Sequence, residues 1–188
     1  LVDDHPAAVQ HESGGPARVR DWVRMALEFG GGTLEMQHYL KMRRGPYIVL
    51  AVLDESISRD PVQVTGTFVN LFDPSLALHD AMIFQPGDVA LLYDVNWGRE
   101  RQALPAVAVA STRVRQVQRS SNAIVFRTRG PKNTVAKMQL LLPGAPSEIE
   151  LSPALPFEQR YDPVAGTLFL SFANMADDVE VRVQMQSN

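Results

Sequence analysis

The chain has 188 residues, of which 45% are hydrophobic and 21% charged, and a formal net charge of -3. This composition can bury a full core in one domain, and the acidic balance excludes a general nucleic-acid binder, which needs a basic surface. Because the chain contains no cysteine, disulfides, thiolate metal sites and cysteine nucleophiles are excluded as well.

No apolar run approaches the roughly 20 residues that a bilayer crossing requires, and the first residues lack the pattern of a signal peptide. We therefore expect no contact with a membrane. The absence of cysteine does not fix the compartment, and an extracellular or periplasmic location is compatible with it. The first residue is Leu and not Met, which leaves open that the chain is part of a longer protein.

The N-terminal part of the chain predicts a flexible tail followed by one helix. Residues 1–16 are small and polar and are interrupted by proline and glycine, which favours a mobile tail. Residues 17–29 place apolar side chains on one helical face, and the glycines up to residue 32 form a linker. The apolar face consists of Val19, Trp22, Val23 and Ala26. We expect this face to cover the sheet edge or to contact another domain or subunit.

The next segments have the periodicity of strands. Residues 34–43 alternate between apolar and polar side chains, which indicates a half-buried strand. Residues 45–56 hold the longest run of large apolar residues, which predicts a central strand covered on both faces. Further short strand-like segments lie near residues 62–72, 81–84, 88–94, 106–118, 123–129, 134–142, 148–151, 166–173 and 178–186.

Turns rich in glycine and proline separate these segments, and no second helical pattern follows residue 32. Parallel sheets need helical crossovers, so the pattern predicts an all-β, antiparallel β-sandwich, Ig-like or related, over residues 33–188. We expect about 9–11 strands, preceded by the one amphipathic helix. Residues 99–105 are the best place for a long connection between sheets; a boundary there between two small β-domains is the alternative.

An uneven distribution of charge marks a candidate binding face. Residues 101–147 contain no Asp or Glu, whereas the regions on both sides are acidic. If residues 107–118 and 123–129 form a hairpin, Arg113 and Arg115 face Arg129 and Arg127 across the ladder, an unfavourable pairing that needs neutralising carboxylates. Neighbouring strands could supply them; alternatively, the four arginines bind an acidic partner or an anionic ligand.

A second candidate site surrounds Trp97, in a turn-like stretch that also contains the polar residue types found in carbohydrate sites. The predicted ligand-binding residues are Trp97, Tyr93, Asp94, Asn96 and Arg99. A flat indole ring can contact the apolar face of a sugar while the polar side chains bond its hydroxyls. Packing or a domain contact is the other interpretation of Trp97.

No catalytic, metal or cofactor motif is found. The adjacent pairs Asp54–Glu55 and Asp177–Asp178 lie in predicted turns and are interpreted as solvated, whereas glycoside hydrolysis needs two carboxyls that converge on one bond. There is no nucleophile elbow, phosphate loop or dinucleotide fingerprint. We therefore expect no catalytic residue, no metal and no cofactor.

Several turn and strand motifs resemble one known type of domain. The motifs are residues 42–48, 53–56, 70–74, 85–87, 92–94, 130–136 and 161–172. Together they resemble the C-terminal all-β accessory domain that follows the catalytic barrel in some bacterial glycoside-hydrolase-like proteins. In such proteins the catalytic carboxylates belong to the barrel, so the resemblance implies a non-catalytic accessory or interaction domain of a carbohydrate-active protein. A stand-alone carbohydrate-binding module and a small hydrolase with an unrecognised site are the alternatives.

Overall fold

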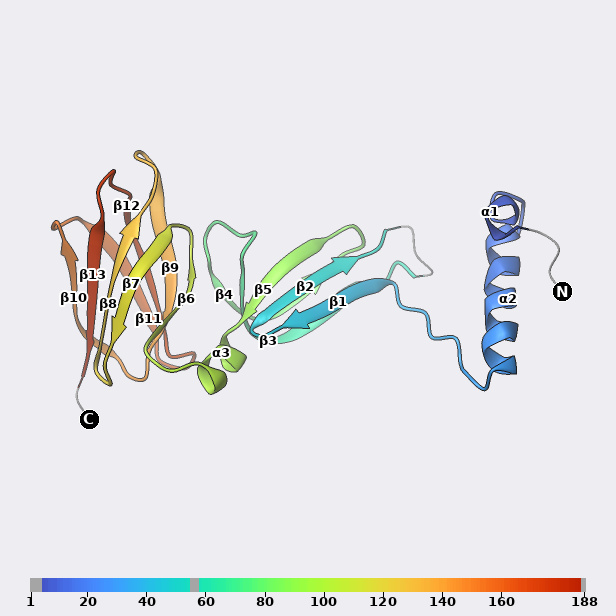
Figure 1. The fold of residues 1–188 in the computed structure, drawn as a ribbon, viewed down its shortest axis with the longest axis horizontal. Helices are drawn as coiled ribbons and strands as arrows, with labels where there is room; N and C mark the ends of the chain where they lie inside the picture. The colour runs from blue at the N-terminus through green and yellow to red at the C-terminus, as the bar shows by residue number, and fades with distance from the viewer. Residues whose placement is uncertain (1–4, 55–57, 187–188) are drawn as a thin grey trace. The chain divides into compact units, whose positions relative to one another are not determined.

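The computed structural model describes residues 5–54 and 58–186 (Figure 1). The chain divides into two units, one ending at His38 and the other beginning at Tyr39. The first unit is helical. The second is mostly β, with three antiparallel sheets, which confirms the predicted all-β class preceded by an amphipathic helix. Glu55 and Ser56, which end the predicted central strand, lie outside the described residues.

The helical unit contains α1 (Pro6–Val9) and α2 (Gly15–Phe29). The predicted helix over residues 17–29 corresponds to α2. A short helix, α1, lies within the segment predicted as a tail, where four residues are too few to produce a helical pattern. The side chain of His5 caps α1 by accepting a hydrogen bond from the N–H of Ala7, 3.2 Å away. Val9 is buried, and its carbonyl approaches Gly15 so closely that any side chain there would collide with it.

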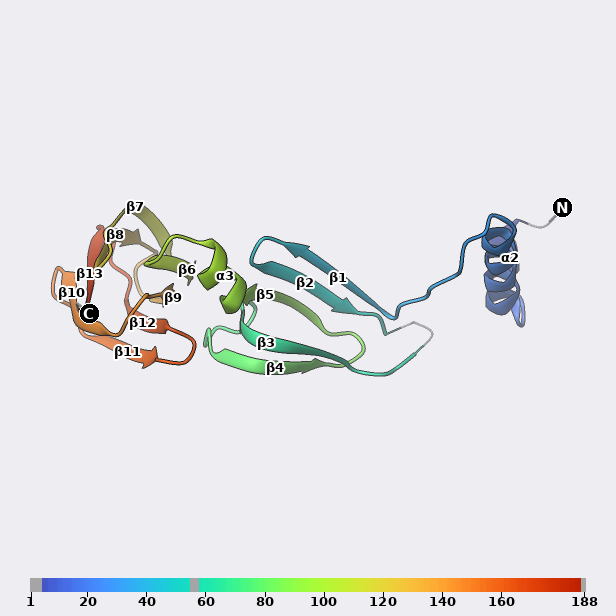
Figure 2. The same cartoon turned by 90° about the horizontal axis from the view of Figure 1, so that it is seen from below.

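The second unit begins with a five-stranded sheet whose strand order is β1-β2-β5-β3-β4. Its strands are β1 (Tyr39–Arg44), β2 (Tyr47–Val52), β3 (Val62–Asn70), β4 (Leu78–Phe84) and β5 (Val89–Asp94). The predicted strand over residues 34–43 therefore begins later, at Tyr39. Figure 2 shows the same strands from a second direction.

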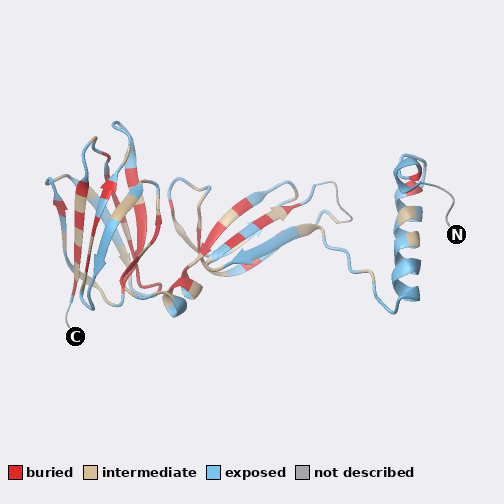
Figure 3. Ribbon diagram, in the orientation of Figure 1, coloured by how far each residue is buried: buried red, intermediate tan, exposed pale blue. Residues whose placement is uncertain are grey.

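The prediction of a central strand covered on both faces is wrong for β2. The central strand of the sheet is β5, and β2 lies between β1 and β5. Ile48, Leu50 and Val52 are buried, whereas Tyr47 and Val49, on the other face, are 39% and 46% exposed, an alternation that Figure 3 shows along the strand. A continuous apolar run thus formed a strand with only one face in the core.

A short helix, α3 (Val95–Arg101), follows β5 directly. It corrects the prediction that no helix follows residue 32 and that Trp97 lies in a turn. Asp94 is the N-cap of α3, and its side chain accepts a hydrogen bond from the N–H of Trp97 at 3.0 Å. Seven residues with a glycine in the middle are too few to show a helical period, which explains why the sequence pattern did not reveal α3.

The rest of the chain forms a sandwich, built from two four-stranded antiparallel sheets with the orders β11-β12-β9-β6 and β10-β13-β8-β7. It occupies only the part from Ala106 onward of the range 33–188 over which a sandwich was predicted. The strands are β6 (Ala106–Ala110), β7 (Arg113–Arg119), β8 (Ala123–Arg129), β9 (Val135–Leu141), β10 (Pro146–Ser152), β11 (Phe157–Asp162), β12 (Thr167–Ala173) and β13 (Val179–Met185). Buried side chains from both sheets, among them Phe126 and Leu168, form its core.

Two details of the sandwich differ from the predicted strands. The single strand expected over residues 106–118 is two strands in different sheets, separated at Ser111 and Thr112. The hydroxyl of Ser111 accepts a hydrogen bond from the N–H of Lys137 at 2.9 Å, which holds this change of sheet in place. The strand β11 was not predicted, because it is an edge strand with mainly polar, exposed side chains.

Contacts between the five-stranded sheet and the sandwich make residues from Tyr39 onward one compact unit. A third apolar cluster joins Val69 and Tyr93 of the five-stranded sheet with Leu141 of the sandwich. Gln139 donates a hydrogen bond from Nε2 to the carbonyl of Leu76 at 2.8 Å, inside buried surroundings. The chain passes between the two parts through α3 and residues 102–105.

Candidate functional site

The principal candidate site, here called the Trp97 pocket, is a cavity of about 370 Å³ beside α3. Strands β1, β2, β3 and β5 and helix α3 contribute to its wall. Its lining residues are Lys41, Arg43, Ile48, Gln63, Val64, Thr65, Gly66, Phe68, Asp94, Asn96, Trp97 and Glu100. This volume falls in the range of about 300–1,000 Å³ that is typical of small-molecule sites. The lining combines aromatic, amide, hydroxyl and charged groups.

Asp94 organises the pocket through both of its carboxylate oxygens. One oxygen accepts the N–H of Trp97 at 3.0 Å, and the other accepts a hydrogen bond from Nη2 of Arg43 at 2.8 Å. Arg43 lies on β1, so this ion pair joins the start of α3 to a strand more than fifty residues earlier. The carboxylate therefore holds Trp97 and Arg43 in position.

The indole ring of Trp97 is half-buried and is oriented by two neighbours. Gly45, in the β1–β2 turn, has φ +59°, and a Cβ built there would lie 3.6 Å from Cη2 of Trp97. The guanidinium carbon of Arg101 lies 5.9 Å from the ring centroid, a cation–π distance. Glycine at position 45 thus satisfies the left-handed backbone beside the ring, where a Cβ would make an ordinary van der Waals contact.

The structure brings together three of the five predicted ligand-binding residues: Trp97, Asp94 and Asn96 line the pocket. Tyr93 does not line the pocket and is 0% exposed, because successive side chains of a strand point to opposite faces and Asp94 takes the pocket side. Arg99 also lies outside the pocket, and its Nη1 donates a hydrogen bond to the carbonyl of Val164 at 3.3 Å. Two residues along a helix rotate a side chain by about 200°, so Arg99 cannot share the direction of Trp97.

Five polar lining residues were missed by the sequence analysis: Lys41, Arg43, Gln63, Thr65 and Glu100. The first four come from β1 and β3, whose positions around β5 depend on long-range pairing that no local pattern reveals. Glu100 could have been predicted from the sequence, because it follows Asn96 by four residues on a helix and therefore lies on the same face. Recognising Asp94 as an N-cap would have exposed this relation.

Tyr93 is a buried structural residue with a perturbed hydroxyl. Its ring packs edge-on against Tyr47, with centroids 5.6 Å apart, and its hydroxyl donates to Oε1 of Gln102 at 3.3 Å. Burial, with a smaller contribution from Tyr47, raises the pKa of Tyr93 from 10.0 to about 12.

This raised pKa of Tyr93 predicts a loss of stability in alkali. The unfolded chain releases the phenolic proton at a lower pH than the folded chain, so the stabilisation is complete below pH 10 and is lost between pH 10 and 12. A shift of this size corresponds to a loss on the order of 2–3 kcal/mol. Urea unfolding of the wild type and of Tyr93→Phe at pH 9, 10 and 11 measures the first half of it, about 1.4 kcal/mol by pH 11. Parallel pH curves for the two proteins would contradict the prediction.

The predicted arginine hairpin is present, with β7 and β8 paired so that Arg113 faces Arg129 and Arg115 faces Arg127. The neighbouring strand region supplies two carboxylates, as one of the two interpretations required. Nη2 of Arg115 lies 3.0 Å from Asp178, and Nε of Arg127 lies 3.5 Å from Glu180. Within the described part of the chain, neither Arg113 nor Arg129 has a carboxylate partner.

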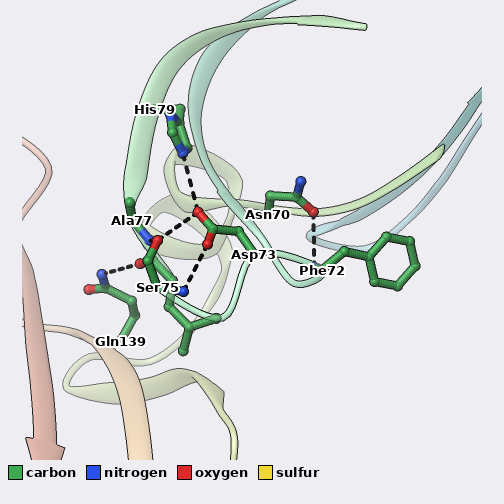
Figure 4. Close-up of polar contacts among 8 residues, drawn as sticks. Asn70, Phe72, Asp73, Ser75, Ala77, His79 and Gln139 are labelled. Atoms are coloured by element: carbon green, nitrogen blue, oxygen red, sulfur yellow. Dashed lines mark hydrogen bonds and ion pairs between the residues drawn. The ribbon is translucent and has the colours of Figure 1, made fainter. Parts of the chain in front are cut away.

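Asp73 and Ser75 in the loop between β3 and β4 and His79 on β4 are the residue types of a hydrolytic triad (Figure 4). The hydroxyl of Ser75 donates to Oδ2 of Asp73 at 2.6 Å, and Nε2 of His79 lies 3.9 Å from the same oxygen. A triad needs the histidine beside the serine, whereas here the aspartate lies between them. Bonds from the hydroxyl and N–H of Ser75 hold the pKa of Asp73 below its usual value, which suits a charged turn residue.

Among the described residues, no group of three or more His, Asp or Glu side chains is placed to bind a metal ion. No helix in residues 5–54 or 58–186 is long and apolar enough to cross a membrane. On α2, Val19 and Trp22 are half-buried within the helical unit, and Val23 and Ala26 are exposed.

Comparisons of the chain with protein-family models, with curated proteins and with solved structures each gave no match. The resemblance to glycoside-hydrolase accessory domains therefore stays a prediction from the sequence motifs. The Trp97 pocket is the feature from which a function can be argued.

Proposed function

We propose that this chain is a non-catalytic β-domain of a carbohydrate-active, glycoside-hydrolase-like protein, and that it binds a sugar unit in the Trp97 pocket. The observation that supports this proposal is the grouping of a half-buried indole ring with amide, hydroxyl and charged side chains around one cavity. A pyranose has the matching chemistry, with an apolar C–H face for the ring and hydroxyls for the polar groups. The charges of the lining are balanced, since it holds two cationic side chains, Lys41 and Arg43, and two anionic ones, Asp94 and Glu100, which favours a neutral sugar.

The bonding of Asp94 supports binding over hydrolysis. A glycosidase needs one carboxyl free to attack or to donate a proton and a second one across the scissile bond. Both oxygens of Asp94 already accept hydrogen bonds, from Arg43 and from the N–H of Trp97. These two bonds give the carboxylate a structural role, because they hold the start of α3 against β1.

The proposal includes a contact through α2 to another domain or subunit of the same carbohydrate-active protein. The apolar side chains of this helix support it, since Val23 and Leu27, four residues apart on one face, are 44% and 38% exposed. Exposed apolar residues gathered on one amphipathic helix are typical of a surface that packs against a neighbour.

The Trp97→Ala variant tests sugar binding. Titration of the chain with neutral oligosaccharides is expected to change the tryptophan fluorescence of the wild type, and calorimetry is expected to show at least a tenfold loss of affinity in Trp97→Ala, because the stacking surface is removed. Trp22→Ala is the matched control, since it removes the other of the chain's two tryptophans and leaves the pocket intact.

Two outcomes would contradict this proposal. The first is equal affinity of Trp97→Ala and wild type for every oligosaccharide that binds. The second is release of reducing ends from an oligosaccharide by the wild type, lost in Asp94→Asn with the fold retained. That result would identify the chain as a hydrolase.

A further inference from the structure

A groove between β6 and β7 is independent of the Trp97 pocket. It has a volume of about 510 Å³ and a mainly apolar lining that includes Ala106, Val107, Ala110, Val114 and Val117. These strands follow each other in the chain but belong to opposite sheets of the sandwich, and Figures 1 and 2 show them side by side. The groove therefore opens along one side of the sandwich, between its two layers.

Both strands that border the groove are edge strands. β6 pairs only with β9 and β7 only with β8 among the strands in the described residues, so each has an open edge with backbone donors and acceptors. In the first half of β7, Val114 lines the groove while Arg113 and Arg115 alternate with it. A bulge follows at Gln116, which has φ 52°. Beyond it Val117 and Arg119 line the groove, and Val117 is 41% exposed.

The arginines beside the groove have carboxylate partners on one side only. Toward β13, the carboxylates of Asp178 and Glu180 pair with Arg115 and Arg127. Arg113 lies on the edge strand itself and has no carboxylate partner in the described part of the chain. The sequence from residue 101 to residue 147 contains no Asp or Glu that could supply one. The open edge of β7 is thus a cationic edge next to an apolar groove.

We propose that β7 accepts an extended acidic segment of a partner protein as an added strand. Its alternate side chains would be small and apolar, filling the groove beside Val114, and acidic, lying beside Arg113 and Arg115. Strand addition supplies main-chain hydrogen bonds to the open edge, and the alternation of the segment supplies specificity. The added carboxylates complete the row of charges, so that the arginines have anions on both sides.

Binding of designed peptides to the full chain tests this site. The probe is a fluorescein-labelled peptide in which Glu and Val alternate over seven residues, and the control replaces each Glu with Lys. Anisotropy is expected to show at least tenfold tighter binding of the acidic peptide, weakened by added salt. N-methylation of alternate amides in the acidic peptide, which blocks ladder hydrogen bonds at unchanged charge, is expected to cost at least tenfold.

Variants of the chain locate the site. Arg113→Glu is expected to weaken binding of the acidic peptide at least tenfold, and Val117→Asn severalfold, because they remove the cation and part of the apolar lining. Arg160→Glu is the control, since it makes the same change on β11, at the other edge of the sandwich. Circular dichroism and thermal unfolding of each variant separate loss of the site from loss of the fold.

Three results would overturn the inference. One is equal binding of the acidic and lysine peptides. Another is tight binding of the N-methylated peptide, which would show an anion surface without strand addition. The third is a wild-type dimer that Val117→Asn converts to a monomer, because the occupant of the groove would then be a second copy of the chain.

Discussion

Gly98→Val is expected to lower the free energy of unfolding of the β unit by about 3 kcal/mol, the upper part of the range for overpacking. Gly98 lies in α3, where a Cβ would collide with the hydroxyl oxygen of Tyr93 and lie 3.0 Å from Cδ1 of Leu141. Tyr93 belongs to the five-stranded sheet and Leu141 to the sandwich, and both are fully buried. Neither can move without disturbing the packing between the two parts.

Helix propensity alone predicts that Gly98→Val raises the free energy of unfolding. Valine is more favourable than glycine within a helix by a few tenths of a kcal/mol. The steric term is several times larger, because the atoms in the way belong to buried side chains. The clash therefore decides the result, and a neutral or stabilising effect of Gly98→Val would show that α3 does not pack as described.

Gly144→Val is the matched control for Gly98→Val. A Cβ at Gly144 meets no atom within 4 Å, so the same substitution there is expected to change stability by less than about 0.5 kcal/mol. Urea denaturation followed by circular dichroism measures both variants. Equal losses would indicate a general cost of replacing glycine and would contradict the specific role of Gly98.

Features that depend on neighbours in the sequence could be predicted. Arg113 and Arg115 face Arg129 and Arg127 because a short turn joins their strands and a bulge at Gln116 shifts the register by one residue. The helix over residues 17–29 was visible because three turns are enough to show a period. The hairpin and α2 were therefore predictable from local pattern, whereas the bulge was not.

Features that depend on distant neighbours could not be predicted. The burial of β2 on one face only reflects which surfaces pack onto the five-stranded sheet, and hydrophobicity along a strand does not encode this. The Trp97 pocket needed Arg43 of β1 to meet Asp94 of β5. That contact follows from the strand order β1-β2-β5, which requires the whole sheet to be known. The sequence therefore revealed the aromatic residue of the candidate site but not most of its polar partners.

Phe126→Ala is expected to have the largest effect of any substitution considered, a loss of about 3–5 kcal/mol in the free energy of unfolding. Phe126 lies on β8, is 0% exposed and belongs to the core between the two sheets of the sandwich. Truncation to alanine removes a buried aromatic ring from the core and leaves a cavity that the surrounding strands cannot close. A loss of this size is comparable to a large part of the total stability of a domain.

Phe72→Ala is the control that separates the effect of burial from that of the Phe-to-Ala change itself. It makes the same substitution at a side chain that is 61% exposed, and the hydrogen bond from the N–H of Phe72 to Asn70 does not involve the ring. Its expected cost is below about 0.5 kcal/mol.

Because residues from Tyr39 onward form one compact unit, Phe126→Ala is also expected to lower the unfolding midpoint reported by Trp97 fluorescence. A Trp97 midpoint that stays unchanged would show that the five-stranded sheet unfolds independently of the sandwich.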